Sequence, residues 1–438
     1  MKKSWFFRKV PTPGEERGAP LYVVRRRLAA GAGALVLALV AILFAALGDM
    51  AQHAFRVLQE RWPLAPLVIT PAFFAGVIYV TNTWYSGAKS SGIPQVIAAA
   101  KNPQTVDSRS LLSLPTALVK MIMTLAMMIV GGSVGREGPA VQVSAAIMVA
   151  FHRLLRVPIT SGVVIAGGAA GVAAAFNTPL AGVAFAIEEL AAGFEQRVAV
   201  LVMGTVVVAG LVSLGIAGDY VYFGAMRSTL PIESVVVVAP VAGIVGGLVG
   251  GLFSRMLLAM TKPRYAWQTA IKSRPVLMAA TCGLVVATTG IIAGGSTWGT
   301  GYEATRALIE GETTSLWFGP AKFLATLATA LSGAPGGIFA PSLSVGAGFG
   351  QLLAVAFPDD PTGAVVLLGM MGYFVGVVRA PLTAVVILME TTASRGMILP
   401  LFATALVADG VSALVCRDKL YHGLATALMP EPEQPPKS

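Results

Sequence analysis

The stretch Gly131-Gly-Ser-Val-Gly-Arg-Glu-Gly-Pro139 decides how the rest of the chain is interpreted. A long apolar run, residues 121–130, precedes it, and a second uncharged segment follows it. Arg136 and Glu137 therefore stand between two segments that can lie in lipid, where a charge is costly and marks a functional site by default. The glycines let backbone amides approach a ligand, and Pro139 suits the first turn of a helix. The stretch predicts a glycine loop at a helix N-terminus, which favours an anion, yet it carries its own anion in Glu137.

Composition places the chain among multi-pass membrane proteins. Of its 438 residues, 55% are hydrophobic and 12% are charged, whereas soluble proteins average about 25% charged residues. Long uncharged runs recur from residue 28 to residue 416. The first run, Leu28–Leu47, is long enough to span a membrane and has no small-residue cleavage pattern at its end. We therefore expect an all-α polytopic membrane protein whose first helix is retained.

Positive charge gathers before the first apolar run and indicates orientation rather than nucleic-acid binding. The net charge is +10, and basic residues next to a first span favour the cytoplasmic side of the membrane. We expect a cytoplasmic N-terminus, the lipid bilayer as a partner and no nucleic acid. The lack of an added regulatory domain suggests a prokaryotic cell (inner) membrane. The basic residues are Lys2, Lys3, Arg8, Lys9, Arg17, Arg25, Arg26 and Arg27.

The apolar segments after residue 111 are short and interrupted by Gly and Pro. Several have near 15 residues by our reading of the sequence, fewer than the roughly 20 that an upright transmembrane helix needs. Short and broken helices are typical of transporters, in which half-helices meet near the middle of the membrane. The pattern predicts a site inside the membrane.

The chain also repeats itself. A shift of 202 residues aligns the two halves without a gap, and it matches lysine, proline and glutamate as well as small apolar residues. We expect a cytoplasmic segment at 1–29, membrane repeats at 30–218 and 235–425, a linker at 219–234 and a disordered tail at 426–438. Identity alone leaves parallel and inverted halves open, although inverted halves are the commoner arrangement in transporters. Matched pairs include Lys120/Lys322, Gly135/Gly337, Pro139/Pro341, Pro179/Pro381 and Glu188/Glu390.

Three of the polar islands in this apolar background share one design, a glycine followed by a proline that opens a helix. They are residues 90–94, 135–139 and 336–341. Each presents free amides and the positive end of a helix dipole to an anion. Ser91 adds a hydroxyl donor and Tyr421, in a fourth island, adds another. Ser91 could instead cap a helix, and Tyr421 could be an aromatic residue at the membrane interface.

Together these motifs resemble those of the CLC family of chloride channels and chloride/proton antiporters. The resemblance covers the chain from about residue 30 to residue 425 and includes the three glycine-proline motifs in order. Two further stretches strengthen it, Gly167-Gly-Ala-Ala-Gly-Val-Ala-Ala-Ala-Phe-Asn-Thr-Pro-Leu-Ala-Gly and Phe185-Ala-Ile-Glu-Glu189. The resemblance implies two inverted-topology repeats of tilted helices, one anion pathway per subunit, and a homodimer.

The resemblance also implies roles for single residues. The hydroxyls of Ser91 and Tyr421 would contact the central anion, and the amides of Ile338 and Phe339 would complete that site. Glu137 would be the outer gating glutamate, which competes with the anion for one place. Glu189 would be the inner proton-transfer glutamate, found in many antiporters and absent from the channels. The supporting residues would be Gly135, Arg136, Gly138, Pro139 and Lys120.

The function expected from this resemblance is the exchange of chloride for protons, with a passive chloride channel as the alternative. A serine at position 91 goes with chloride in the family. We expect no enzymatic activity, no cofactor and no metal, since neither the two cysteines nor the three histidines have ligand spacing. No phosphate-binding loop is present in the sequence, which disfavours ATP-driven pumping.

Other matched residues have structural interpretations. We expect Glu188 and Glu390 to serve structure rather than transport, because they recur at equivalent positions. The recurrence of Lys120 and Lys322 in apolar runs suggests buried ion pairs that orient the halves. Arg136 is expected to anchor the glycine loop rather than to bind the permeating ion.

Overall fold

The computed structural model describes residues 20–105, 110–190, 196–218, 221–226, 228–261, 263 and 265–429. The basic residues from Lys2 to Arg17 and most of the predicted tail lie outside the described residues. Within them the fold is helical, and the only extended pairing is one isolated bridge. The prediction of an all-α protein is confirmed.

The first half of the chain runs from a long N-terminal helix to α9. Its first helix begins before the first apolar run, so the predicted boundary at residue 30 falls inside a helix. The elements are α1 (Pro20–Arg61), α2 (Pro66–Thr83), η1 (Ser86–Ala88), α3 (Ile93–Lys101), α5 (Leu114–Met128), α6 (Glu137–Leu154), α7 (Ser161–Phe176), α8 (Pro179–Phe185), the π-helical turn η2 (Ala186–Leu190) and α9 (Gln196–Ala217).

The second half follows a linker that joins α9 to α10. Tyr222 and Phe223 of this linker are buried, so it packs onto the helices instead of standing in solvent. The elements are α10 (Ile232–Thr261), α11 (Ala266–Lys272), α12 (Pro275–Ile292), α13 (Tyr302–Ile309), α14 (Phe318–Leu331), α15 (Phe339–Ala356), α16 (Thr362–Val378), α17 (Pro381–Thr392), η3 (Arg395–Met397), α18 (Ile398–Val415) and α19 (Leu420–Thr426).

Helix lengths agree with a membrane protein that has a broken interior. Among the described residues, seven helices are long and apolar enough to cross a membrane, namely α1, α2, α9, α10, α12, α15 and α18. Five further apolar helices have only 10–17 residues, namely α5, α7, α14, α16 and α17. The prediction of short apolar helices is confirmed for these five.

The repeat in the sequence is also a repeat in structure. Helices α6 and α15 begin at Glu137 and Phe339, which the 202-residue shift aligns. Helices α8 and α17 begin at matched prolines, where the missing N–H is not needed. Helices α7 and α16 end at matched left-handed residues, Asn177 and Arg379. The same proline and turn signals therefore start and stop equivalent helices in both halves.

Equivalent helices run in opposite directions where the halves meet. Glu188, just after α8, accepts hydrogen bonds from the first-turn amides of Leu382 (3.1 Å) and Thr383 (2.7 Å) in α17. Glu390, near the end of α17, accepts them from Leu180 (3.1 Å) and Ala181 (2.7 Å) in α8. The end of each helix lies against the start of the other, which is the relation expected of inverted halves. Both contacts are structural, as predicted for this pair.

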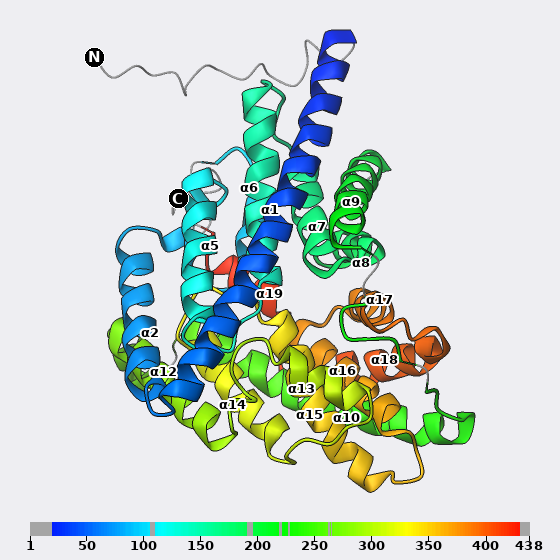
Figure 1. Cartoon of the computed structure of the whole chain (residues 1–438). Helices are drawn as coiled ribbons and strands as arrows, with labels where there is room; N and C mark the ends of the chain where they lie inside the picture. Colours follow the sequence, from blue (N-terminus) through cyan, green and yellow to red (C-terminus); the bar gives the residue numbers. More distant parts are fainter. Residues whose placement is uncertain are drawn as a thin grey trace, which may run out of the picture.

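Figure 1 shows how the halves assemble. In that view α6, α7 and α9 lie above, α10, α15, α16 and α18 lie below, and α19 lies between them. The long helix α1 packs against α6, α7 and α9, and α10 packs against α16 and α18. The equivalent helices α2 and α12 also pack against each other. Elements from both halves therefore surround the point where α6 and α15 begin.

Candidate anion and proton site

The two glycine loops that precede α6 and α15 are hydrogen-bonded to each other. The amide of Gly135 donates to the carbonyl of Gly337, and the amide of Gly337 donates to the carbonyl of Gly135, both at 2.7 Å. This pair forms the isolated antiparallel bridge of the fold. Two residues that the sequence repeat makes equivalent thus lie side by side at the centre of the molecule.

Each loop ends in a helix N-terminus with unused amides. The first intrahelical bond of α6 runs from Ala140 to the carbonyl of Arg136, and that of α15 runs from Ser342 to the carbonyl of Ile338. The amides of Phe339 and of Glu137, which precede these donors, have no partner within their own helix. Pro139 lies in the first turn of α6, as predicted. Two positive helix ends therefore meet where the glycine loops touch.

Ser91 lies against this junction from the third glycine-proline segment. A Cβ atom placed on Gly138 would meet the Ser91 carbonyl oxygen at 2.9 Å and the Gly337 Cα at 3.1 Å, and would overlap the Ser91 hydroxyl. Only a glycine at position 138 lets the Ser91 hydroxyl come so close to the α6 N-terminus. The helix-capping alternative for Ser91 is wrong, because the N-cap of α3 is Gly92 and no side chain caps it.

Tyr421 reaches the same place from α19. Its side chain is completely buried, so the alternative of an interfacial aromatic residue is wrong. Its ring centroid lies 5.9 Å from that of Phe339. The hydroxyls of Tyr421 and Ser91 are near enough to interact electrostatically, yet neither has a hydrogen-bond partner of ordinary geometry within the described residues. Two buried hydroxyl donors with unsatisfied capacity thus adjoin the helix ends.

The Phe339 side chain fills the volume beside the amides of α15. Its ring centroid lies 5.0 Å from Phe374, 6.0 Å from Phe185 and 6.3 Å from Phe176. These contacts hold the first turn of α15 in place. The site therefore combines backbone and hydroxyl donors with an apolar, aromatic wall.

Glu137 places an acidic side chain at the junction of α6 and α15. It is 0% exposed, and neither carboxylate oxygen has a hydrogen-bond partner among the described residues. The charge of Arg136 acts on it, and so do the amides of Glu137 itself and of Ala340. The carboxylate thus lies at the two helix N-termini, near their amides but without a hydrogen bond of ordinary geometry. A buried, unpartnered charge of this kind costs stability and indicates function.

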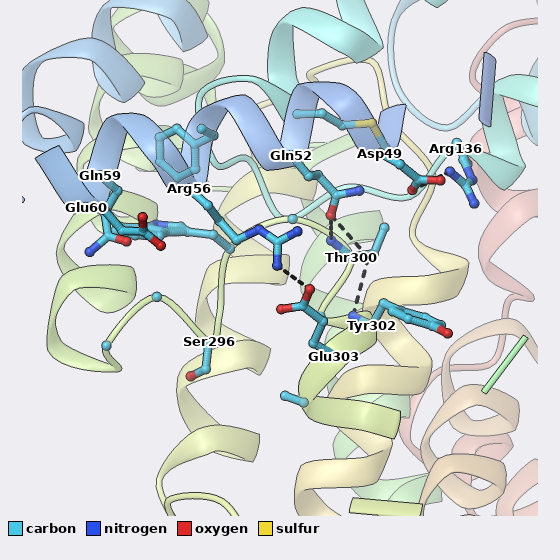
Figure 2. Close-up of a pocket in the computed structure, with 18 of the residues that line it drawn as sticks. Asp49, Gln52, Arg56, Gln59, Glu60, Arg136, Ser296, Thr300, Tyr302 and Glu303 are labelled. Carbon is cyan, nitrogen blue, oxygen red and sulfur yellow. Dashed lines mark hydrogen bonds and ion pairs between the residues drawn. The ribbon is translucent and has the colours of Figure 1, made fainter. Parts of the chain in front are cut away.

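Arg136 holds the glycine loop onto α1, as predicted. Its guanidinium donates to the carbonyl of Ala45 at 2.6 Å and to the carboxylate of Asp49 at 2.7 Å. Figure 2 shows Arg136 and Asp49 at one end of a cavity of about 660 Å³ between α1 and the segment before α13. Arg56 and Glu303 form an ion pair across this cavity. A water-accessible space therefore reaches the residue next to Glu137.

Glu189 is a second buried glutamate, and it lies beside His422 of α19. It belongs to the π-helical turn η2, and its side chain is 0% exposed. The Nδ1 atom of His422 lies 3.3 Å from its Oε1 atom. The sequence interpretation missed His422, since it looked only for metal-ligand spacing. The signal that could have found it is its position directly after Tyr421.

The expectation for the buried lysines is wrong. Among the described residues, neither lysine has an acidic partner in an ion pair. The Lys120 ammonium donates to the carbonyls of Ala88 (3.1 Å), Lys89 (3.0 Å) and Ser90. The Lys322 ammonium donates to those of Thr297 (2.8 Å) and Gly299 (2.7 Å). Carbonyl dipoles satisfy each charge, and Lys120 thereby fixes the turn that carries Ser91.

A known family model matches most of this chain, and that match identifies the family. The model of the voltage-gated chloride channel matches residues 72–413, which include both glycine loops and both buried glutamates. The chain belongs to the voltage-gated chloride channel family. It is a multi-pass membrane protein, as the apolar helices indicate. The resemblance inferred from the motifs is confirmed.

Relatives in the voltage-gated chloride channel family are similar over most of their length. The "H(+)/Cl(-) exchange transporter ClcA" of Yersinia pestis bv. Antiqua (strain Angola) is 30% identical over 412 residues, 89% of this chain and 82% of the relative. The crystal structure of a slow cyanobacterial Cl⁻/H⁺ antiporter superposes with a TM-score of 0.76 at 23% identity, over 93% of this chain and 98% of that one. A CLC-type fluoride/proton antiporter superposes with a TM-score of 0.74 at 22% identity, over 91% and 97%. These two structures show that the fold is shared.

Proposed function

We propose that this protein exchanges chloride for protons across the membrane, as a secondary active transporter. The observation that carries the proposal is the Glu137 carboxylate, buried without a hydrogen-bond partner at the meeting point of two helix N-termini. An anion fits the same place, because unused amides and hydroxyls of Ser91 and Tyr421 surround it. One position thus suits either the carboxylate or a chloride ion.

Competition for that position links the two ions. The ionised carboxylate of Glu137 occupies the helix ends and excludes chloride. Protonation removes its charge and its attraction to the amides, so the neutral side chain leaves and chloride enters. Binding of chloride and binding of a proton then favour each other, which is the coupling that an exchanger needs.

A second acid gives the proton a separate route. Glu137 and Glu189 are both buried, and both carboxylates act electrostatically on the Tyr421 hydroxyl. Two buried carboxylates that both act on one residue of the anion site can serve as separate stations for a proton. This arrangement favours exchange over passive conduction.

The choice of chloride as the anion, the dimer and the location in the cell are further parts of the proposal, supported by the relatives and by single residues. The Yersinia relative is named as an H⁺/Cl⁻ exchanger, and Ser91 supports chloride as the anion. A homodimer with one pathway per subunit, a cell-membrane location and a cytoplasmic N-terminus complete the proposal. Gly135, Arg136, Gly138, Pro139 and Lys120 support the site through the contacts described above.

Reversal potentials in reconstituted liposomes test the proposal. With equal chloride on both sides, a pH gradient should shift the reversal potential of an exchanger and should leave that of a channel at zero. Glu137→Gln, which removes the titratable group, should lower proton uptake at least about a hundredfold while anion flux continues. Glu390→Gln, which changes a half-buried acid outside the site, is the control and should keep coupling. A wild-type potential unaffected by pH would mean a channel, and persistent proton uptake in Glu137→Gln would exclude Glu137 as the gate.

A further inference from the structure

Glu189 has no direct access to water. Its carboxylate is 0% exposed, and neither oxygen has a hydrogen-bond partner of ordinary geometry within the described part of the chain. A proton that reaches this carboxylate from solvent must therefore pass through another group. The imidazole of His422 lies beside it, with Nδ1 3.3 Å from Oε1.

His422 is placed to connect solvent with Glu189. Its side chain is 38% exposed, so one side of the ring meets water while Nδ1 faces the buried carboxylate. Imidazole is the side chain best suited to take up and release protons near neutral pH. We propose that His422 is the proton-relay residue between solvent and Glu189. This inference rests on the proposed exchange and names the route by which one of its substrates enters.

The relay step is a proton transfer that needs no other reactant. A hydronium ion from solvent protonates Nε2 of the neutral imidazole, whose hydrogen is on Nδ1, and becomes water. The Nδ1–H of the resulting imidazolium then passes to the Glu189 carboxylate at Oε1. The products are a neutral carboxyl on Glu189 and a neutral imidazole with its hydrogen on Nε2. The half-exposed ring then turns so that Nδ1 takes the next proton from water. Charge is conserved at each step, because one cation and one anion become two neutral groups.

The neighbouring acid Glu188 is unsuited to the same task. Both of its oxygens accept hydrogen bonds from the first-turn amides of α17, Leu382 and Thr383. Those contacts direct it towards the other half and hold it there.

Other charged groups in the described part of the chain also act on the pair. Besides His422, Lys419 and Glu188 act electrostatically on Glu189, and Glu189 acts on Tyr421. From α10, the contact with α19 is made by the apolar side chain of Leu258 against Gly423. Of these groups, His422 has a nitrogen 3.3 Å from the Glu189 carboxylate, so it is the group placed to exchange its own proton with that carboxylate.

Separate measurement of proton and chloride flux in liposomes tests the relay. His422→Gln keeps a polar side chain of similar size but cannot carry a proton at neutral pH. Proton uptake should fall about tenfold, chloride flux should fall less, and the ratio of chloride to protons should rise. In His422→Ala, added imidazole should restore proton uptake, a result that a purely structural role would not give. His53→Gln, which replaces an exposed histidine on α1, is the matched control and should behave as wild type.

A second background separates the relay from the proposed exchange. In Glu189→Gln, adding His422→Gln should not change proton uptake further, because the two residues act in series. Unchanged proton uptake in His422→Gln, an equal loss of both fluxes, or no effect of imidazole would overturn the relay and leave the exchange standing. A wild-type protein without proton coupling would remove both proposals.

Discussion

The N-terminus of α6 and the N-terminus of α15 have the same backbone and different chemistry. Both follow a glycine loop, both carry a proline in the first turn, and the two loops are hydrogen-bonded to each other. The first residue is Glu137 in α6 and Phe339 in α15. One helix end therefore carries a carboxylate, and the other carries a ring held by aromatic neighbours. The comparison teaches that the duplicated backbone builds the site, and that the difference between Glu137 and Phe339 supplies the switch in the exchange proposed above.

Other matched residues have kept one role in both halves. Lys120 and Lys322 each hold a loop by its carbonyl groups, and Glu188 and Glu390 each bind the first turn of a helix in the opposite half. Comparing a substitution in one half with its equivalent in the other therefore separates structural effects from functional ones.

The largest difference is expected between Gly337→Ala and Gly135→Ala. A methyl group on Gly337 would lie 2.8 Å from the Gly138 nitrogen and 3.1 Å from the Gly135 oxygen, which are backbone atoms that cannot move aside. Overpacking of this kind costs about 1–3 kcal/mol, so we expect a lower thermal midpoint and lower yield of folded protein in detergent.

The equivalent substitution, Gly135→Ala, places its methyl group against a side chain that can move. A methyl group on Gly135 would overlap the end of the Glu137 side chain. Gly135→Ala should therefore stay closer to wild-type stability, displace the carboxylate, raise chloride flux and weaken proton coupling. Equal losses of stability in both variants would contradict the comparison.

A smaller difference is expected between Lys120→Met and Lys322→Met. Each variant leaves buried carbonyls without a donor, which costs about 1–3 kcal/mol for each such group. Lys120 also fixes the turn before Ser91, so chloride binding in Lys120→Met should weaken about tenfold, equivalent to about 1.4 kcal/mol. Lys322 holds the Thr297–Gly299 loop beside the cavity of Figure 2. Chloride titration calorimetry should therefore show unchanged affinity in Lys322→Met, and equal weakening in both would refute the role of Lys120.

The smallest difference is expected between Glu188→Gln and Glu390→Gln. Each carboxylate accepts two amide hydrogen bonds at a helix N-terminus, and a carboxamide has a single oxygen to offer. The loss should resemble that of a helix cap, about 0.5–2 kcal/mol, and thermal unfolding should show nearly the same decrease for both. A large loss of transport in only one of them would show that the pair is not equivalent.

Helix boundaries and the duplication could be predicted from the sequence, because proline and glycine act on the local backbone. Pro139, Pro179 and Pro381 mark first turns in the structure as they do in the sequence. A fixed spacing between matched lysines, prolines and glutamates needs no knowledge of the fold. The prediction that Ser91 and Tyr421 share one site rested on the family resemblance. Residues so far apart in the chain have no local sequence pattern that shows they meet.

The partners of the buried lysines and of Glu189 could not be read from the sequence. Every residue has a carbonyl group, so the chain gives no sign that three consecutive carbonyls converge on Lys120. The expectation of a partner of opposite charge for Lys120 was therefore wrong. His422 meets Glu189 only because α19 folds back against α3 and η2 lies beside it. Such contacts depend on tertiary packing, which residue spacing does not reveal.

The reciprocal contacts of Glu188 and Glu390 have a consequence for how the protein matures. When the first half has been synthesised, the amides at the start of α8 still lack their acceptor, and Glu188 still lacks its donors. Both sets of hydrogen bonds form when α17 packs against α8. The contact between the halves thus forms in one event, and a chain stopped before α17 leaves the Glu188 carboxylate and the two amides at the start of α8 without these hydrogen-bond partners.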